Sequence, residues 1–111
     1  MDSKTRVLIA DTSEEYRLLL SDILSSEGDF EVVGCTGDGQ QAYTLVLEKK
    51  PNVLITDIIL TGIDGLALIS KLSDLQDQQK PAVIIVSGFA SEQTLAEASS
   101  LGVSYYMQKP C

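Results

Sequence analysis

Histidine is absent from this chain of 111 residues, and so is tryptophan. Histidine is the commonest general base and the commonest zinc ligand, so histidine-based catalytic triads and metal sites are excluded. Cysteine occurs only 2 times, at Cys35 and Cys111, without the C-x-x-C spacing of a metal or redox site. Any chemistry of this chain must therefore use carboxylates, hydroxyls or lysine.

Positive charge is also scarce. The chain has 8 Lys and Arg against 16 Asp and Glu, which gives a formal net charge of −8. Nucleic acids and anionic lipids are bound by clustered cations, so we expect this domain to make no direct contact with nucleic acid and none with a membrane. Cations are the ligands that such a chain attracts.

Long hydrophobic runs are missing too. The longest, such as residues 83–86, are far below the roughly 20 residues that span a bilayer. The residues after Met1 are polar, unlike the apolar leader of a secreted protein. Because 44% of the residues are apolar, the length predicts one compact soluble domain, and we expect it in the cytoplasm.

Short β-branched runs alternate with amphipathic segments along the chain. The runs predict strands buried on both faces, at residues 7–10, 30–35, 53–56, 83–86 and 103–107. Apolar residues spaced by three and four predict a helix after each of the first four strands. This alternation predicts an α/β fold, with a doubly wound parallel sheet of order 2-1-3-4-5.

Details of the helices can also be predicted. Thr12, followed three residues later by Glu15, fits a capping box at the start of the first helix. Asp64 is the expected N-cap of the third helix. The leucines at residues 18–20 are expected to belong to the core rather than to a membrane or partner face.

Polar side chains stand where the predicted strands end. Asp11 follows the first strand, Asp57 the third, Ser87 the fourth and Lys109 the fifth. These ends meet at one edge of a parallel sheet, where ligands bind at the switch point. Two carboxylates, a hydroxyl and an ammonium suggest a metal-dependent acyl-phosphate site, with Asp57 as nucleophile and Asp11 as metal partner. Lys109 would stabilise charge on the transferring group.

The same residues carry a resemblance that spans the whole chain. Asp57 in ITDIILTGIDG, Ser87 in IIVSGFAS and the pair Lys109-Pro110 stand in the order and spacing of a two-component response-regulator receiver domain. The stretches DIILTGIDGLALISKL and LGVSYYMQKP are most similar to the receiver of the stage-zero sporulation transcription factor of endospore-forming bacteria. The sequence is therefore identified as a member of the receiver family.

The resemblance implies a role for each of these residues. Asp57 would take a phosphoryl group from a phosphodonor protein, a histidine kinase or phosphotransferase. Asp11, Asp57 and the Ile59 carbonyl would bind Mg²⁺, or else Mn²⁺ or Ca²⁺. Ser87 and Lys109 would contact the phosphoryl group. Receivers are signalling domains, so turnover of a free substrate is not expected.

A conformational switch is implied as well. In the family, the hydroxyl of the Ser87 position moves toward the phosphoryl group, and the aromatic residue of the fifth strand, here Tyr106, follows it inward. This reshapes the surface of the fourth helix and fifth strand, which a partner reads. Homodimers on phosphorylation, a C-terminal DNA-binding effector domain and a cis bond between Lys109 and Pro110 are further implications.

Two departures from the family pattern concern the metal. The family usually has a second acidic residue after the first, and here Thr12 takes that place. The usual proline of the loop after the phosphorylated aspartate is replaced by Thr61, which is expected to loosen the Ile59 carbonyl. Mg²⁺ manages with one or two carboxylates plus waters, so we expect weak rather than abolished binding.

Two other functions remain open. A degenerate receiver would act as an interaction module without phosphate, and Thr12 and Thr61 are the residues that favour it. A haloacid-dehalogenase-like phosphatase also combines an Asp nucleophile with a hydroxyl and a lysine at strand ends. That enzyme needs a second Asp two residues after the nucleophile, where this chain has Ile59.

The end of the sequence carries one more expectation. The receiver is taken to occupy residues 1–111, and the chain stops where the family's fifth helix begins. With that helix missing or truncated, the apolar sheet face beside the first helix is expected to lie partly bare.

Overall fold

A single parallel sheet organises the computed structural model, which describes residues 3–88 and 91–109. Its strands are β1 (Thr5–Ala10), β2 (Phe30–Thr36), β3 (Val53–Thr56), β4 (Ala82–Ser87) and β5 (Tyr105–Gln108). They are ordered β2-β1-β3-β4-β5, and every neighbouring pair is parallel. The predicted doubly wound sheet is confirmed.

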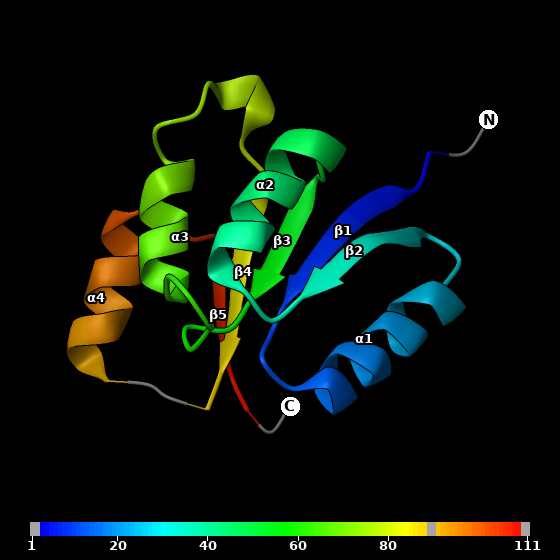
Figure 1. Ribbon diagram of the computed structural model, residues 1–111, viewed down its shortest axis with the longest axis horizontal. Coiled ribbons are helices and arrows are strands. Elements are labelled where there is room, and N and C mark those ends of the chain that lie inside the picture. The colour runs from blue at the N-terminus through cyan, green and yellow to red at the C-terminus, as the bar shows by residue number, and fades with distance from the viewer. Residues whose placement is uncertain (1–2, 89–90, 110–111) are drawn as a thin grey trace.

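Helices cover both faces of this sheet. They are α1 (Glu14–Ser26), α2 (Gly39–Lys49), α3 (Gly65–Leu72) and α4 (Glu92–Ser100), with a short 3₁₀ turn, η1 (Asp77–Gln79), before β4. The chain steps from β1 to β2 in one direction and from β2 to β5 in the other. Right-handed crossovers therefore put α1 on one face and α2, α3 and α4 on the other, as Figure 1 shows.

Side-chain caps define where the helices begin. Asp64 is the N-cap of α3, as predicted. The predicted cap at Thr12 is wrong, because the N-cap of α1 is Ser13, whose hydroxyl accepts from the Tyr16 amide at 3.1 Å. The Ser13 amide itself donates to the Asp11 carboxylate at 2.9 Å, and the backbone of Ser13 is extended, so the helix begins one residue later than predicted.

The fifth strand begins later than the sequence pattern predicts. Residue 103 lies just after α4 and caps its end, because the Val103 amide donates to the Ala98 carbonyl at 3.3 Å. Gly102 lies between them with a φ of +86°, a conformation that favours glycine and ends the helix. The Ser104 amide donates to the Val83 carbonyl of β4 at 2.9 Å, and the regular register of β5 with β4 starts at Tyr105.

The main core lies between the sheet and the layer of α2, α3 and α4. Its largest fully buried side chains are Leu8, Leu54, Leu68, Ile85 and Val46. Successive strand residues point to opposite faces, so Val7 and Ile9, which are equally buried, face α1 instead. The buried strands match the near-continuous apolar runs of the sequence.

Helix α1 departs from the prediction. It contains no buried residue, and Leu18 and Leu19 are 60% and 56% exposed. The expectation that residues 18–20 belong to the core is therefore wrong for these two. Among the described residues no other helix lies on this face, so α1 packs against the sheet alone (Figure 1). On this face Met107 is also 45% exposed, so the expected partly bare surface is present.

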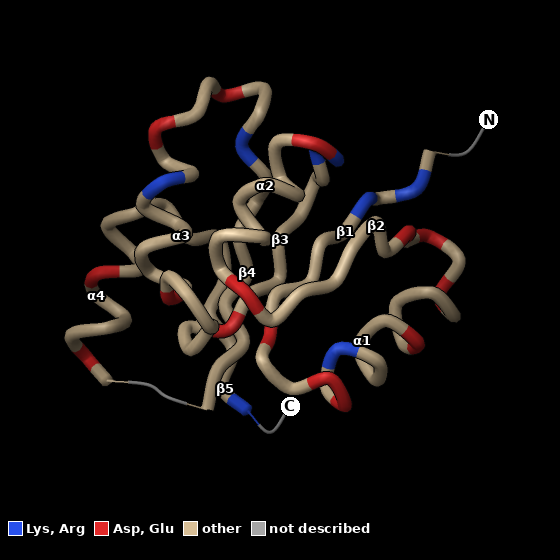
Figure 2. The backbone as a smooth tube through the Cα atoms, viewed as in Figure 1, with Lys and Arg blue, Asp and Glu red and all other residues tan. Residues whose placement is uncertain are grey.

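Charge is distributed unevenly over the surface. Acidic residues are spread over the helices and loops of both layers, with few Lys and Arg among them (Figure 2). In the ranges 3–88 and 91–109, the structure has no helix long and apolar enough to cross a membrane.

A close backbone approach fixes the loop that leaves β3. The Gly65 amide, at the start of α3, donates to the Ile58 carbonyl at 2.6 Å. A β-carbon on Gly65 would stand 2.2 Å from the Asp57 carbonyl oxygen and 2.8 Å from the Ile58 Cα. Only glycine lets α3 begin this close to the end of β3, and this contact holds the segment that carries Asp57.

We predict that Gly65→Ala destabilises the protein by about 1–3 kcal/mol, because the backbone must shift to admit the methyl group. Urea denaturation followed by circular dichroism measures this. Gly88→Ala is the matched control, since the nearest atom that a β-carbon there would meet, Lys109 Cβ, is 4.0 Å away. Equal stability of the two variants would contradict the prediction.

Candidate functional site

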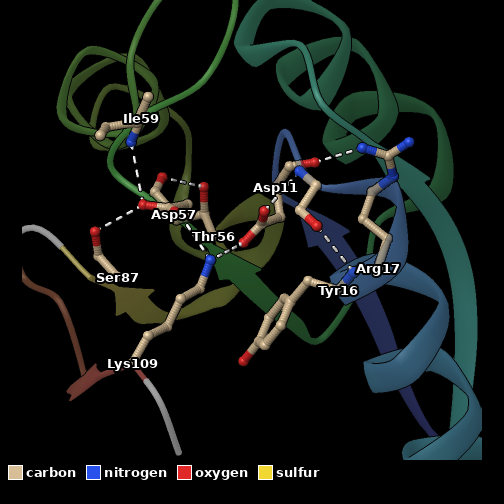
Figure 3. A network of polar contacts seen from close by, with 9 residues as sticks. Asp11, Tyr16, Arg17, Thr56, Asp57, Ile59, Ser87 and Lys109 are labelled. Carbon is tan, nitrogen blue, oxygen red and sulfur yellow. Dashed lines mark hydrogen bonds and ion pairs between the residues drawn. The ribbon is translucent and has the colours of Figure 1, made fainter.

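The strand ends bring the predicted site residues together. Asp11, Asp57, Ser87 and Lys109 meet at one edge of the sheet, as expected from the order of the strands (Figure 3). Asp11 is 3% exposed, Asp57 7% and Ser87 0%. The Asp57 amide donates to the Ala10 carbonyl at 2.9 Å, so the pairing of β1 with β3 extends to the residues that carry both carboxylates.

Both carboxylate oxygens of Asp57 accept hydrogen bonds. Oδ1 accepts from the Ser87 hydroxyl at 2.7 Å and from the Ile59 amide at 3.2 Å. Oδ2 accepts from Lys109 Nζ at 3.0 Å. Burial by itself would raise the pKa of this carboxyl, but the bonds from Ser87, Lys109 and Ile59 together hold the pKa below its usual value. Asp57 is therefore a carboxylate at neutral pH.

Asp11 is held by the start of α1. Its Oδ2 accepts from Lys109 Nζ at 2.7 Å, while its Oδ1 accepts from the Ser13 amide at 2.9 Å. The Arg17 guanidinium donates to the backbone carbonyl of Asp11 at 2.6 Å. The carboxylate is thus oriented toward Asp57 by the first turn of the following helix.

Lys109 links the two carboxylates. Its ammonium lies between Asp11 and Asp57, and it stands 4.3 Å from the centre of the Tyr16 ring. Partial burial would lower the pKa of this amine, but the hydrogen bonds and charges of the two aspartates outweigh that effect and raise the pKa. The ammonium offsets the repulsion between two carboxylates that lie close together in a buried place.

The two carboxylates suit a hard cation. Asp11 and Asp57 already share one cationic group, the Lys109 ammonium, which shows that both point toward a common position. Thr12 is exposed, and the described residues contain no group of three or more Asp, Glu, His or Cys that could hold a metal. An oxygen set with only two carboxylates fits Mg²⁺ or Mn²⁺ that keeps several waters, and it fits the larger coordination shell of Ca²⁺ less well.

The loop after Asp57 is tied down at Thr61. The amide and the hydroxyl of Thr61 both donate to the Gly37 carbonyl, each at 3.0 Å, and the Thr61 carbonyl accepts from the Gly39 amide at 2.9 Å. Proline has no amide hydrogen and could not make the first of these bonds. The loop is therefore held by hydrogen bonds where the family's proline would hold it by a fixed φ, and the expected loosening of the Ile59 carbonyl stays a prediction.

The two tyrosines of β5 face opposite sides of the sheet. Tyr105 is 70% exposed, whereas Tyr106 is partly buried and packs against the core beneath α4. Burial and the negative charge of Asp57 raise the pKa of the Tyr106 phenol. The expected cis bond between Lys109 and Pro110 lies outside the described residues.

Residues 7–111 match the response regulator receiver domain family. The chain belongs to this family. The receiver is 31% identical to the response regulator domain of Thermotoga maritima CheB, with a TM-score of 0.88 over 97% of this chain and 80% of that one. A DNA-binding response regulator of the LuxR family from Staphylococcus aureus is 29% identical, with a TM-score of 0.88 over 96% of this chain and 88% of that one.

A third solved structure has the same fold. The complex of CheX, CheY, BeF₃ and Mg²⁺ from Borrelia burgdorferi matches the receiver at 24% identity, with a TM-score of 0.87 over 96% of this chain and 78% of that one. The flavodoxin-like receiver fold predicted from the sequence is thereby confirmed.

Three contributors to the site were not predicted from the sequence. Ser13, Tyr16 and Arg17 all lie at the start of α1 and contact Asp11 or Lys109. In the sequence, Tyr16 fits the apolar stripe of an amphipathic helix, and this pattern gives no sign of its contact with Lys109. The available signal was position, because a helix that starts directly after β1 has its first turn at the same sheet edge as the strand end.

We predict that the receiver loses stability relative to Asp57→Asn as the pH falls below about 5. A carboxyl whose pKa is lowered by folding stabilises the folded state above its unfolded pKa, and this contribution disappears as the pH falls through the folded pKa. Urea denaturation at a series of pH values measures the difference. Ser87→Ala removes one of the bonds to Asp57 and should give an intermediate profile. Parallel profiles of the receiver and Asp57→Asn would contradict the prediction.

Proposed function

We propose that Asp57 is the phosphoacceptor of this receiver and takes a phosphoryl group from a phosphodonor protein. The observation that carries the proposal is the buried Asp57 carboxylate at the switch point, with the Ser87 hydroxyl at 2.7 Å and the Lys109 ammonium at 3.0 Å. A nucleophile, a hydroxyl donor and a fixed cation within hydrogen-bond distance are the groups that acyl-phosphate formation needs.

The transfer uses Asp57 in its deprotonated form. One oxygen of Asp57 forms a bond to phosphorus while the bond between phosphorus and the donor breaks, and the electron pair leaves with the donor. No proton has to be removed from Asp57, because its pKa is lowered. Lys109 stays beside the negative charge of the phosphoryl oxygens, and the Ser87 hydroxyl donates to one of them in the product.

In this proposal Asp11, Asp57 and the Ile59 carbonyl would hold a divalent cation. Mg²⁺ or Mn²⁺ held there would screen the repulsion between the carboxylate and the incoming phosphoryl group. The solved Borrelia complex, which contains CheY with BeF₃ and Mg²⁺, supports such a site in a protein of the same fold. Thr12 supplies no carboxylate, so binding is weak.

The proposed output is a change of the surface formed by α4 and β5. Ser87 moves toward the phosphoryl group and Tyr106 moves inward behind it. Tyr106 lines a groove of about 230 Å³ between the two elements, and inward movement of its ring would reshape that groove. The remaining groove residues are Leu95, Ala98, Ser99, Val103, Ser104 and Tyr105.

The surface then controls a partner in the cytoplasm. A C-terminal DNA-binding effector domain is the proposed partner, since the similar Staphylococcus aureus protein is a DNA-binding response regulator. The motifs DIILTGIDGLALISKL and LGVSYYMQKP support a role in sporulation. Phosphorylation is proposed to favour a homodimer, and size-exclusion chromatography with and without phosphodonor tests this.

We predict that incubation with acetyl phosphate and Mg²⁺ adds the mass of one phosphoryl group to the receiver and adds none to Asp57→Ala, which lacks the nucleophile. Intact-protein mass spectrometry measures the gain. Asp74→Ala, which removes an exposed carboxylate outside the site, is the matched control and should gain the group like the unmodified chain.

Other results of this experiment would support a different acceptor or a different function. No gain with either Mg²⁺ or Mn²⁺ would sink the proposal and support a phosphate-independent receiver. A gain that persists in Asp57→Ala would put the acceptor at another residue. Steady hydrolysis of a chromogenic phosphate ester would instead support a phosphatase.

A further inference from the structure

The ring of Tyr16 lies against the ammonium that bridges the two carboxylates. Lys109 Nζ stands 4.3 Å from the ring centre, well within the roughly 6 Å over which an aromatic face attracts a cation. Tyr16 comes from the first turn of α1 and Lys109 from the end of β5, so tertiary structure alone makes this contact (Figure 3).

We propose that Tyr16 is a positioning residue that holds the Lys109 ammonium on Asp11, and so sets how readily a divalent cation binds there. This inference rests on the proposed function, in which Asp11 and Asp57 hold the cation. Tyr16 takes no part in the transfer itself.

Competition for oxygen atoms is the physical basis. Lys109 Nζ occupies Oδ2 of Asp11 at 2.7 Å and Oδ2 of Asp57 at 3.0 Å. A divalent cation on the same carboxylates is repelled by an ammonium a few ångströms away, so the ammonium must move aside. Thr12 adds no carboxylate to those of Asp11 and Asp57, so no further negative charge from that position offsets the ammonium. Any contact that favours the present place of the ammonium therefore weakens cation binding.

The place of the ring is tied to Asp11. The Tyr16 amide donates to the Ser13 hydroxyl at 3.1 Å, and the Ser13 amide donates to Oδ1 of Asp11 at 2.9 Å. The neighbouring Arg17 donates to the Asp11 carbonyl at 2.6 Å. These bonds fix the first turn of α1 relative to the carboxylate, so the ring meets the ammonium at the point where it bridges the two aspartates.

The Tyr16 side chain is only partly buried. Helix α1 has no buried residue, and Tyr16 also lines an open groove of about 460 Å³ with Ser13, Glu15 and Leu19. A leucine at residue 16 keeps apolar bulk there and removes the aromatic face together with the hydroxyl. A phenylalanine keeps the face and removes only the hydroxyl.

We predict that Tyr16→Leu tightens Mn²⁺ binding about two- to fivefold, the fold-change that corresponds to loss of a cation–π contact at a partly exposed site. Tyr16→Phe keeps the ring and should bind Mn²⁺ more like the unmodified receiver than Tyr16→Leu does. The spin-resonance signal of free Mn²⁺ measures the dissociation constant directly, without any phosphodonor.

A second pair of variants separates positioning from a general effect on α1. In Lys109→Met no ammonium competes, so adding Tyr16→Leu should leave the Mn²⁺ dissociation constant unchanged. An effect of Tyr16→Leu that persists in this background would overturn the inference. So would unchanged or weaker binding in Tyr16→Leu alone, equal effects of Leu and Phe, or no Mn²⁺ binding by any variant.

Failure of the proposed function has a different signature. A receiver that binds Mn²⁺ with the predicted order of affinities but gains no phosphoryl group at Asp57 retains the positioning role of Tyr16 and loses the phosphoacceptor. A receiver that gains the group while Tyr16→Leu leaves Mn²⁺ binding unchanged retains the phosphoacceptor and loses the positioning role.

Discussion

The ammonium of Lys109 between the carboxylates of Asp11 and Asp57 is the interaction on which the site depends. Two buried carboxylates facing each other repel, and a single cation at 2.7 Å and 3.0 Å from their oxygens makes the arrangement stable. The same cation connects the last strand to the two central ones. The ammonium therefore balances the charge of the two carboxylates and also ties the end of β5 to the ends of β1 and β3.

The sheet supplies this meeting point through its order of strands. Because β1 and β3 are neighbours while their helices leave in opposite directions, an open edge remains at their carboxyl ends. Gly65 lets α3 start against the Asp57 carbonyl, and Thr61 ties the intervening loop to Gly37. Both contacts keep the carboxylate in place without covering it.

Helix α1 contributes to the site more than to the core. Its first turn supplies the amide of Ser13, the ring of Tyr16 and the guanidinium of Arg17 to Asp11 and Lys109. The rest of the helix leaves Leu18 and Leu19 largely exposed. Packing on this face is thus light, and the helix is held where it begins by polar contacts with the end of β1.

The sequence by itself determined the strands, the helices, the sheet order and the four strand-end residues, because apolar periodicity and polar residues after buried runs are local signals. Tertiary structure decided the rest. The exposure of Leu18 depends on what lies opposite α1, and the bonds of Thr61 depend on a loop more than twenty residues away. The contact of Tyr16 with Lys109 joins the two ends of the chain. Such pairings follow from where the sheet brings distant segments together, which no local pattern of residues encodes.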